Sequence, residues 1–419
     1  MSGRSDGALG PADPDVLVVG AGPAGLSAAA ELGRLGIAPV LVVDRESEPG
    51  GIPRHCHHPG FGLQDLRRAM SGPAYARRLT RLAADSGARL SLETTVTRVD
   101  PSGAVSLVSP SGLAELHPRV VLLATGARER PRSARLVPGD RPAGVFTTGQ
   151  LQQWVHSHHL PVGRRAVVVG AEHVSFSAAL TLREAGVETA AIVTDLPRHQ
   201  TLGAFALASR ALLRIPLLTS TRVVAVQGRG RVSAVEFEDR ISGRRRTIGV
   251  DTVVFTGDWV PDHELVRRAG TRMDPATKGP LTDGGGQTSV IGIVAAGNLV
   301  HPAETAGSAA LGGRRVAQRL AGRLRRGDVG RAVDGVEVQV DEPLAWAWPG
   351  IVRPDDVPVR VLLRTRAFTG RRTVSVEQGG RVLGRARLRH ATPNRSLSIP
   401  GDWVADVDLL AGPIELRLV

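Results

Sequence analysis

The N-terminal part of this chain takes its fold from the stretch Asp15-Val-Leu-Val-Val-Gly20-Ala-Gly22-Pro-Ala-Gly25. Four consecutive apolar residues that favour β-structure run directly into a G-x-G-x-x-G pattern, and a helical pattern follows from about residue 24 to residue 35. A second apolar run over 39–43 then stops at Asp44. This order of strand, glycine turn, helix, strand and acid predicts a βαβ unit whose turn binds a dinucleotide.

Each position of the motif has a physical reason. Gly20 permits the tight turn, Gly22 lets the backbone approach a diphosphate, and Gly25 lets the helix and strand pack closely. The helix N-terminus stabilises the phosphate charge, and Asp44 would accept hydrogen bonds from ribose hydroxyls. An ordinary glycine turn lacks this context, so we predict a nucleotide site at Gly20, Gly22, Pro23, Ala24, Gly25 and Asp44.

A second copy of the pattern departs from the first. The strand Ala166–Val169 leads into Gly170-Ala-Glu172-His-Val-Ser175, which has glutamate where the diphosphate approaches and serine where helix and strand pack. A carboxylate that faces a diphosphate repels it, so NAD(P) binding at this copy is doubtful. In the alternative, Glu172 turns away and Asp195 binds a ribose.

The whole chain is expected to be α/β, with two Rossmann-like dinucleotide-binding domains and a small C-terminal all-β domain. We predict a disordered tail over 1–13, and the expected boundaries are 14–150 with 258–326 for the first domain, 151–257 for the second and 336–419 for the third. In the third, apolar residues alternate with polar ones, and Gly379-Gly380 indicates a hairpin turn. Its aromatic residues could form its own core or a docking face, and we predict a core: Trp346, Trp348, Phe368 and Trp403.

Composition restricts the function further. The net charge of +13 comes from 53 basic and 40 acidic residues, but the basic residues are scattered and few aromatic residues interleave them, so no nucleic-acid partner is predicted. Cys56 is the only cysteine, which excludes an internal disulfide, a CxxC pair and a four-cysteine iron–sulfur site; electron chemistry must use a bound cofactor. The first 15 residues lack the apolar core of a signal peptide, and no apolar run reaches about 18 residues, so we expect a cytoplasmic protein without an integral membrane segment.

Further motifs carry a resemblance to a known family. Ala124-Thr125-Gly126, Thr256-Gly257-Asp258 and Gly297-Asn298 follow the glycine motif in the order seen in flavoproteins with two dinucleotide-binding domains. Over about 15–325 the chain resembles the thioredoxin-reductase-like branch of the pyridine nucleotide-disulfide oxidoreductase superfamily. Its segments 50–56, 72–77, 256–259 and 297–302 are similar to FAD subunits of multicomponent dehydrogenases, such as those of hydrogen cyanide synthase and opine oxidase and the alpha chain of sarcosine oxidase.

The resemblance implies that the first domain binds FAD. The glycine motif and Asp44 would hold the adenosine diphosphate half, Thr125 and Gly126 would pass over the adenosine side, and Asn298 would face the ribityl chain where most relatives have aspartate. The remaining predicted cofactor-binding positions are Gly50, Gly51, Val96, Gly297 and Thr305.

The resemblance also places histidines close to the flavin ring. In related disulfide reductases a cysteine pair follows the GG of this loop; the equivalent positions here are Pro53 and His58, so disulfide reduction is excluded. Relatives also carry an iron–sulfur segment, for which this chain lacks cysteine ligands. The catalytic candidates that could accept a substrate proton are His58, His57, His55 and, from the opposite side, His301. The alternative is that these are solvated loop histidines or partner contacts. No metal site is predicted, since adjacent histidines point in different directions.

The predicted function is an FAD-dependent oxidoreductase, the flavin subunit of a multicomponent dehydrogenase. Its substrate would be a small amine, an amino-acid-derived compound or a hydroxy acid, and its partner a second dehydrogenase subunit or a ferredoxin-like electron carrier. Two alternatives stay open: a stand-alone NAD(P)H-dependent flavoprotein reductase, and a non-catalytic assembly subunit.

Overall fold

The computed structural model describes residues 13–201, 214–302, 304–329, 332–354, 356 and 360–419, and it divides the chain into two compact units. The first unit comprises residues up to 54, 60–127 and 261–419, and the second comprises 55–59 and 128–260. The predicted boundary at residue 151 lies inside the second unit. The reason is that β11 (Val145–Thr147) pairs in parallel with β18 (Thr252–Phe255) of the second unit. The predicted tail over 1–13 lies almost wholly outside the described residues.

The first unit is built on a parallel five-stranded sheet in the order β20-β9-β1-β2-β5. The strands are β1 (Val16–Val19), β2 (Val40–Val43), β5 (Arg89–Ser91), β9 (Val120–Leu123) and β20 (Ile293–Ala295). All four residues of β1, β2 and β9 are buried, because the sheet is covered on both faces. This explains why these strands read as continuous apolar runs.

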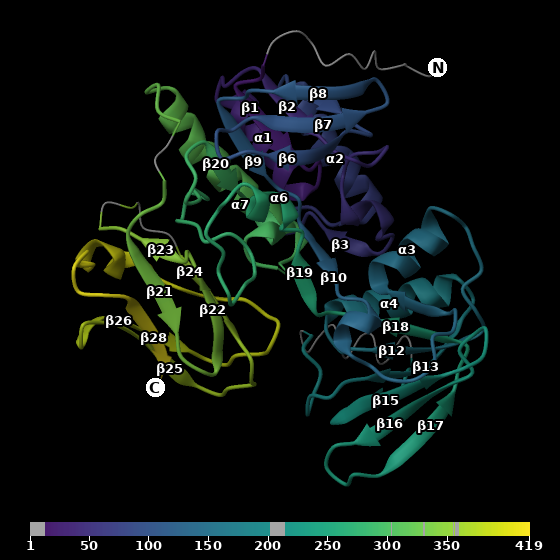
Figure 1. The fold of residues 1–419 in the computed structure, drawn as a ribbon. Coiled ribbons are helices and arrows are strands. Elements are labelled where there is room, and N and C mark those ends of the chain that lie inside the picture. Colours follow the sequence, from purple (N-terminus) through teal and green to yellow (C-terminus); the bar gives the residue numbers. More distant parts are fainter. Residues whose placement is uncertain (1–12, 202–213, 303, 330–331, 355, 357–359) are drawn as a thin grey trace. The chain divides into compact units, whose positions relative to one another are not determined.

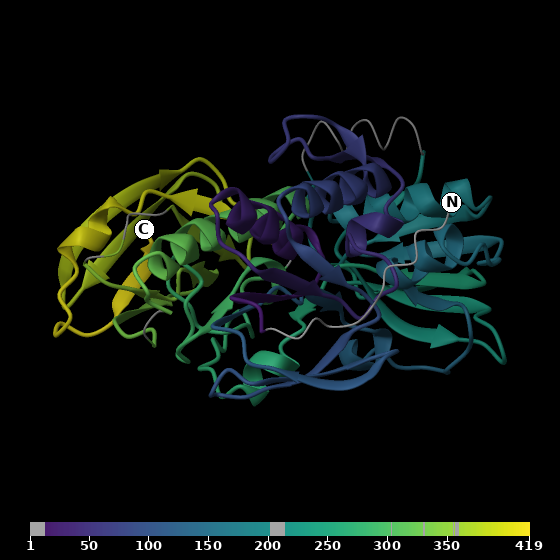
Figure 2. The same cartoon turned by 90° about the horizontal axis from the view of Figure 1, so that it is seen from above.

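Helices cover one face of this sheet. They are α1 (Pro23–Arg34), α2 (Gly72–Asp85) and α7 (Ala306–Leu324), which share an apolar core with Val16 and Val18. Helices α1 and α7 lie side by side (Figures 1 and 2). A Cβ atom on Gly313 of α7 would lie 2.1 Å from the carbonyl oxygen of Ala24, so this close approach requires glycine.

The opposite face of the sheet is covered by an antiparallel meander and by part of the C-terminal domain. The meander contains β6 (Thr95–Val99), β7 (Val105–Ser109) and β8 (Gly112–Leu116). Leu17 and Val19 of β1 share their core with residues of this meander and with Trp346 and Trp348. The second face of the sheet is therefore partly covered by apolar residues that lie more than 300 positions after β1 in the sequence.

Within the described part of 336–419, the regular structure is all-β apart from one 3-10 turn, η4 (Asp402–Asp406), as predicted. Two sheets, β23-β21-β28-β25-β26 and β22-β24-β27, pack around a core that includes Trp403 (Figure 1). Their strands are β21 (Val336–Val340), β22 (Leu344–Trp348), β23 (Ile351–Val352), β24 (Val361–Thr365), β25 (Arg372–Gln378), β26 (Arg381–Leu388), β27 (Leu397–Ile399) and β28 (Ile414–Leu418). Gly379 and Gly380 form the turn between β25 and β26.

The aromatic residues of the C-terminal domain divide between two roles. Strand β22 is buried on both sides: Leu344 and Ala347 face the domain's own core, whereas Trp346 and Trp348 pack against the first sheet. The prediction of an internal core is confirmed for Trp403 and wrong for these two tryptophans. They form the docking face instead: Ala347 and Trp348 point to opposite sides of the strand, and an irregularity in the β22–β24 pairing between Leu344 and Trp346 places those two residues on opposite sides as well.

The second unit repeats the topology of the first. Its sheet has the order β11-β18-β12-β13-β14, and β12, β13, β14 and β18 match β1, β2, β5 and β9 in position. The further elements are α3 (Thr148–His156), β12 (Arg165–Val169), α4 (His173–Glu184), β13 (Glu188–Val193), β14 (Leu217–Leu218), β15 (Thr221–Gln227), β16 (Ala234–Asp239) and β17 (Arg245–Gly249). Strands β15 to β17 form a meander like that of the first unit. The predicted pair of Rossmann-like domains is confirmed.

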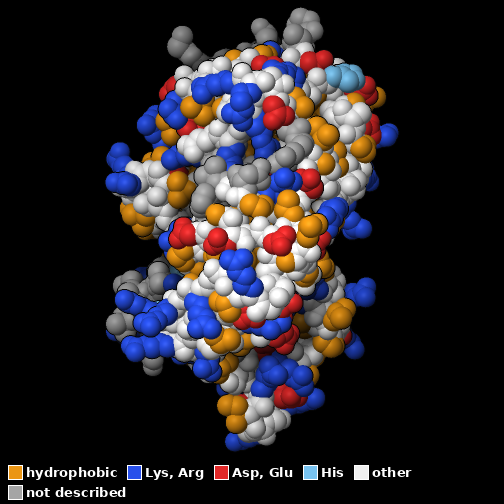
Figure 3. All heavy atoms as spheres, turned by 90° about the vertical axis from the view of Figure 1, so that its left-hand side faces the viewer, with side chains coloured by type: hydrophobic (Ala, Val, Ile, Leu, Met, Phe, Trp, Pro, Cys, Tyr) orange, Lys and Arg blue, Asp and Glu red, His pale blue; other side chains and the backbone are white. Residues whose placement is uncertain are grey.

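Charged side chains on the visible surface are mixed. Figure 3 shows basic side chains spread over the face in view and interleaved with acidic and apolar ones. Within the described residues, no helix is long and apolar enough to span a membrane.

Candidate functional site

The glycines in the glycine turn of the first unit differ in how much space surrounds the position of a Cβ atom. A Cβ atom on Gly20, whose φ is 108°, would lie 2.5 Å from the carbonyl oxygen of Ala124, and one on Gly25 would lie 1.9 Å from that of Gly20. No atom lies within 4 Å of the position that a Cβ atom on Gly22 would take. Gly20 and Gly25 are therefore required by the fold, whereas Gly22 leaves open space for a ligand.

The polar groups around this turn suit an anion flanked by a sugar. Helix α1 begins at Pro23, and its N-cap residue Gly22 provides no side-chain cap, which leaves first-turn N–H groups available to phosphate oxygens. The Asp44 carboxylate lies beside the turn, where Oδ2 accepts a hydrogen bond from the Ala21 amide at 2.6 Å and Oδ1 accepts one from Glu46 at 2.9 Å. Both oxygens keep a further lone pair for a ribose hydroxyl.

Other predicted cofactor residues surround the same turn. The Gly50 amide donates to the Ala21 carbonyl at 2.7 Å, and a Cβ atom on Gly51 would lie 3.0 Å from the Gly22 Cα. Thr125 donates through Oγ1 to the carbonyl of Asp262 at 2.7 Å, while the space beside Gly126 is open. Val96 is partly buried against the core of the second sheet face.

The loop before α7 holds the remaining predicted cofactor residues. Gly297, with φ of 71°, packs against α1, and a Cβ atom there would lie 2.6 Å from the Cβ of Ala24. The Asn298 side chain closes the loop: Oδ1 accepts from the Glu304 amide at 3.0 Å, and Nδ2 donates to the Glu304 carbonyl at 3.2 Å. Thr305 caps α7 by accepting from the Ser308 amide at 3.2 Å. That Asn298 faces a ribityl chain stays a prediction.

His301 lies in this loop between two indole rings. Its ring centroid is 5.5 Å from that of Trp346 and 5.4 Å from that of Trp348. Burial lowers the pKa of His301 to about 3, and the charges of Arg364 and Arg315 lower it further. The imidazole is therefore neutral at physiological pH and a weak base, which weighs against its predicted part as a proton acceptor.

The histidines of the 55–58 loop belong to the second unit, and two of them contact α3 or the residue that follows it. His55 is buried, with Nδ1 3.0 Å from Ser157 Oγ and Nε2 3.2 Å from Gln153 Nε2. His57 stacks on His156 with 3.9 Å between ring centroids. Because both nitrogens of His55 are engaged and His57 is stacked, these two residues have packing roles, which narrows the catalytic proposal to His58.

His58 and Cys56 differ sharply in chemistry. His58 Nδ1 lies 2.9 Å from the carbonyl oxygen of Pro59. Cys56 is buried and donates to Gln152 Oε1 at 3.2 Å; burial, and then the charge of Glu129, raise the pKa of this thiol to about 12. The thiol is thus not a nucleophile at neutral pH. Among the described residues, no group of three or more metal-ligating side chains could hold a metal ion.

The glycine turn of the second unit is filled by its own glutamate. Glu172 Oε1 lies 2.9 Å from the position that a Cβ atom on Gly170 would take and 2.8 Å from the equivalent position at Gly257. This oxygen is buried and has no hydrogen-bond partner among the described residues. The alternative in which Glu172 turns away is therefore wrong. Asp195, the other half of that alternative, is exposed, 3.9 Å from Arg240.

Two further residues complete the closure of this turn. Ser175 is buried, and its Oγ lies 2.7 Å from Oγ1 of Thr256, the residue that follows β18. This hydrogen bond takes the place of the close helix–strand contact that a glycine would allow. Arg135, which sequence reasoning missed, donates to the carbonyls of Thr256 at 2.9 Å and Gly257 at 2.7 Å. Arg135 ends a short 3-10 helix, η2 (Arg132–Arg135), far from the motif in the sequence, so no pattern predicted this contact.

Comparisons with known proteins identify the family. The model of the pyridine nucleotide-disulphide oxidoreductase family matches residues 14–317. The chain belongs to this family. It is 33% identical over 247 residues to an opine oxidase subunit of Rhizobium meliloti (strain 1021), an alignment that covers 58% of the chain and 49% of that protein. It is 30% identical over 353 residues to the alpha chain of sarcosine oxidase from the same organism, covering 80% and 34% respectively.

A solved structure of the family has the same fold. Thioredoxin reductase of T. acidophilum superposes with a TM-score of 0.63 at 22% identity, covering 74% of the chain and 98% of that structure. The chain spans about half of the length of the opine oxidase relative and about a third of that of the sarcosine oxidase relative. As a pyridine nucleotide-disulphide oxidoreductase, this chain is an FAD-dependent enzyme.

The residues of the first unit fit FAD. The open space beside Gly22, the uncapped start of α1 and the Asp44 carboxylate provide room, N–H donors and a ribose acceptor. The second turn does not fit the diphosphate of NAD(P) in the same way, because the Glu172 carboxylate lies over it. A nicotinamide dinucleotide would need that turn open to its diphosphate.

Proposed function

We propose that this chain is the flavin subunit of a multicomponent dehydrogenase that oxidises a small amine, an amino-acid-derived compound or a hydroxy acid. Electrons would pass to a second dehydrogenase subunit or to a ferredoxin-like carrier. The observation that carries the proposal is the Glu172 carboxylate over the second glycine turn. This negative charge would repel the diphosphate of NADH or NADPH, so electrons would enter from an organic substrate. The relatives named as oxidase subunits support the same class.

When bound, FAD supplies the hydride acceptor, and the chain supplies binding and proton transfer. The first turn of α1 would hold the diphosphate, and Asp44 would hold the ribose. His58 is the residue that we propose to accept the substrate proton at a ring nitrogen, since histidine is the side chain that most often serves as a general base.

The test combines a cofactor variant with a choice of reductant. We expect the purified protein to be yellow, and Gly22→Val to lose the flavin but stay folded, because no protein atom lies within 4 Å of the new Cβ. Gly370→Val is the control, because it makes the same change outside the motif at a glycine that also has open space around its Cβ position and no positive φ. Wild-type protein that stays colourless after refolding with excess FAD would overturn the proposal.

The identity of the compound that reduces the flavin distinguishes the three possible functions. Under anaerobic conditions, we expect a small amine, amino-acid-derived or hydroxy-acid substrate to bleach the flavin and NADH or NADPH to leave it oxidised. Rapid bleaching by either nucleotide at micromolar concentration would support a stand-alone NAD(P)H-dependent reductase. If the flavin binds but none of these reductants reduces it, even with the partner subunit present, the result would support a role in assembly only.

A further inference from the structure

The loop before α7 and strand β22 of the C-terminal domain enclose a cationic and aromatic cluster. Its members are His301, Trp346, Trp348, Arg315 and Arg364, all within the first unit. Trp348 is fixed by a hydrogen bond from Nε1 to Thr282 Oγ1 at 3.1 Å. Both indole rings lie next to the imidazole, and this hydrogen bond holds one of them in place.

The charge of Arg364 is matched within the protein. Its Nη2 lies 2.9 Å from Glu304 Oε1, and its Nη1 donates to the Pro302 carbonyl at 2.9 Å. The Ser396 hydroxyl adds a further contact at 3.0 Å. Arg364 is therefore neutralised and bound by the protein itself.

Arg315 has no such match. Its guanidinium carbon lies 5.6 Å from the ring centroid of Trp348, and no carboxylate or hydrogen-bond acceptor contacts it within the described part of the chain. Burial, and then the positive charge of Arg319, lower the pKa of Arg315. A partly desolvated cation beside a second cation is unfavourable unless an anion joins it.

His301 has an unused ring nitrogen next to this cation. Nδ1 is buried and lacks a hydrogen-bond partner in the described residues. Both groups lie against the Trp348 ring, whose centroid is 5.6 Å from the guanidinium carbon of Arg315 and 5.4 Å from the centroid of the His301 ring. An unmatched guanidinium and an unpaired imidazole nitrogen thus share one aromatic frame.

We propose that Arg315 and His301, framed by Trp346 and Trp348, bind the carboxylate of a small organic acid. The guanidinium would donate to the carboxylate oxygens, and Nδ1–H of the neutral imidazole would donate another hydrogen bond. The inference rests on the proposed function, of which it narrows the substrate class: the substrate would be an amino acid derivative or a hydroxy acid, not a simple amine.

The experiment measures anion binding to the FAD-loaded protein by calorimetry, with tryptophan fluorescence as a second readout. The probes are glycolate, acetate and inorganic phosphate. We expect saturable glycolate binding in the wild type, and a loss of about tenfold to a hundredfold in affinity for Arg315→Met, the cost of a charged hydrogen bond. Arg315→Lys should retain part of the affinity, and His301→Gln should lose less than Arg315→Met. The control is Arg326→Met, which removes the same charge from an exposed position just after α7.

Each result decides one point. Equal glycolate affinity in the wild type and Arg315→Met, with the flavin spectrum intact in both, would overturn the carboxylate site and leave the proposed function standing. Phosphate that binds more tightly than glycolate would also overturn the carboxylate assignment. Glycolate binding that depends on Arg315 in a protein without flavin would support the site and contradict the proposed function.

Discussion

Replacing Arg364 by methionine should destabilise the first unit, because the change leaves a buried carboxylate without its counter-ion. The side chains of Arg364 and Glu304 are only 7% and 9% exposed, with 2.9 Å between Nη2 and Oε1. Removing one partner of such a pair costs about 3–5 kcal/mol. We expect a value near the lower limit, because the Ser396 hydroxyl still contacts Glu304.

The cost should also depend on pH. Burial raises the pKa of Glu304 in the wild type, and Arg364 opposes this rise. Without Arg364 the folded-state pKa rises further above the unfolded value, so the penalty is largest when the carboxyl is ionised. It decreases as the pH falls through the folded-state pKa, where the carboxyl becomes protonated. The destabilisation should therefore be smaller at pH 5.5 than at pH 7.5.

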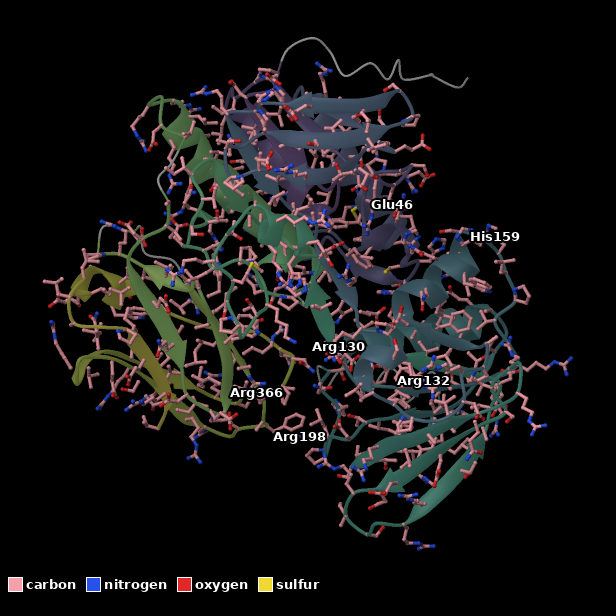
Figure 4. The ribbon with its side chains drawn as sticks, viewed as in Figure 1. Glu46, Arg130, Arg132, His159, Arg198 and Arg366 are labelled. Carbon is pink, nitrogen blue, oxygen red and sulfur yellow. The ribbon has the colours of Figure 1, made fainter. Side chains whose placement is uncertain are left out.

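The assay is urea unfolding followed by tryptophan fluorescence. Trp154→Phe and Trp259→Phe form the background, so that the remaining indoles all report on the first unit. Arg366→Met is the control: Arg366, labelled in Figure 4, follows the same strand, is exposed and lies 4.0 Å from Glu342, so its loss should change stability by less than about 0.5 kcal/mol. The double variant Arg364→Met/Glu304→Gln should recover much of the loss. If Arg364→Met costs no more than Arg366→Met, the buried ion pair does not stabilise the unit and the reasoning is refuted.

Three further predictions concern chemistry and pH. NADH and NADPH should reduce the wild-type flavin slowly or not at all, and Glu172→Gly should speed the reaction at least about tenfold by removing charge from the second turn; unchanged stopped-flow rates would show that Glu172 does not exclude the nucleotide. His58→Ala should keep FAD but slow flavin reduction by the organic substrate at least about tenfold; equal rates would make His58 an ordinary loop residue. The depressed folded-state pKa of His301, about 3, contributes stability above pH 6.5 that is lost as the pH falls toward 3. The wild type should therefore lose up to about 1.4 kcal/mol per pH unit more than His301→Gln in that range, and parallel profiles of stability against pH would contradict the burial argument.

The shape of the first glycine turn could be predicted because most of its constraints are local. Gly20 takes a φ of 108° in the tight turn, Gly25 lies against the carbonyl oxygen of Gly20 five residues earlier, and the flanking strands are apolar throughout because the sheet is covered on both faces. Such features leave a pattern within a window of about 30 residues.

Features that depend on distant partners left no such pattern. The sequence showed that Glu172 replaces a glycine, but the place of its carboxylate depends on Gly257, which comes 85 residues later. The docking role of Trp346 and Trp348 was missed because Leu17 and Val19, which share their core, lie more than 300 positions earlier in the sequence. The boundary at residue 128 was missed because it depends on the pairing of β11 with β18.

The late position of β22 has a consequence for the order in which the chain folds during synthesis. Apart from residues 55–59, the second unit is continuous and is complete once residue 260 has left the ribosome. The first sheet must wait for β20, then α7, and finally for Trp346 and Trp348. Until those indoles arrive, Leu17 and Val19 lack part of their apolar cover, so the nascent N-terminal segment is the stretch most exposed to aggregation and most dependent on chaperones.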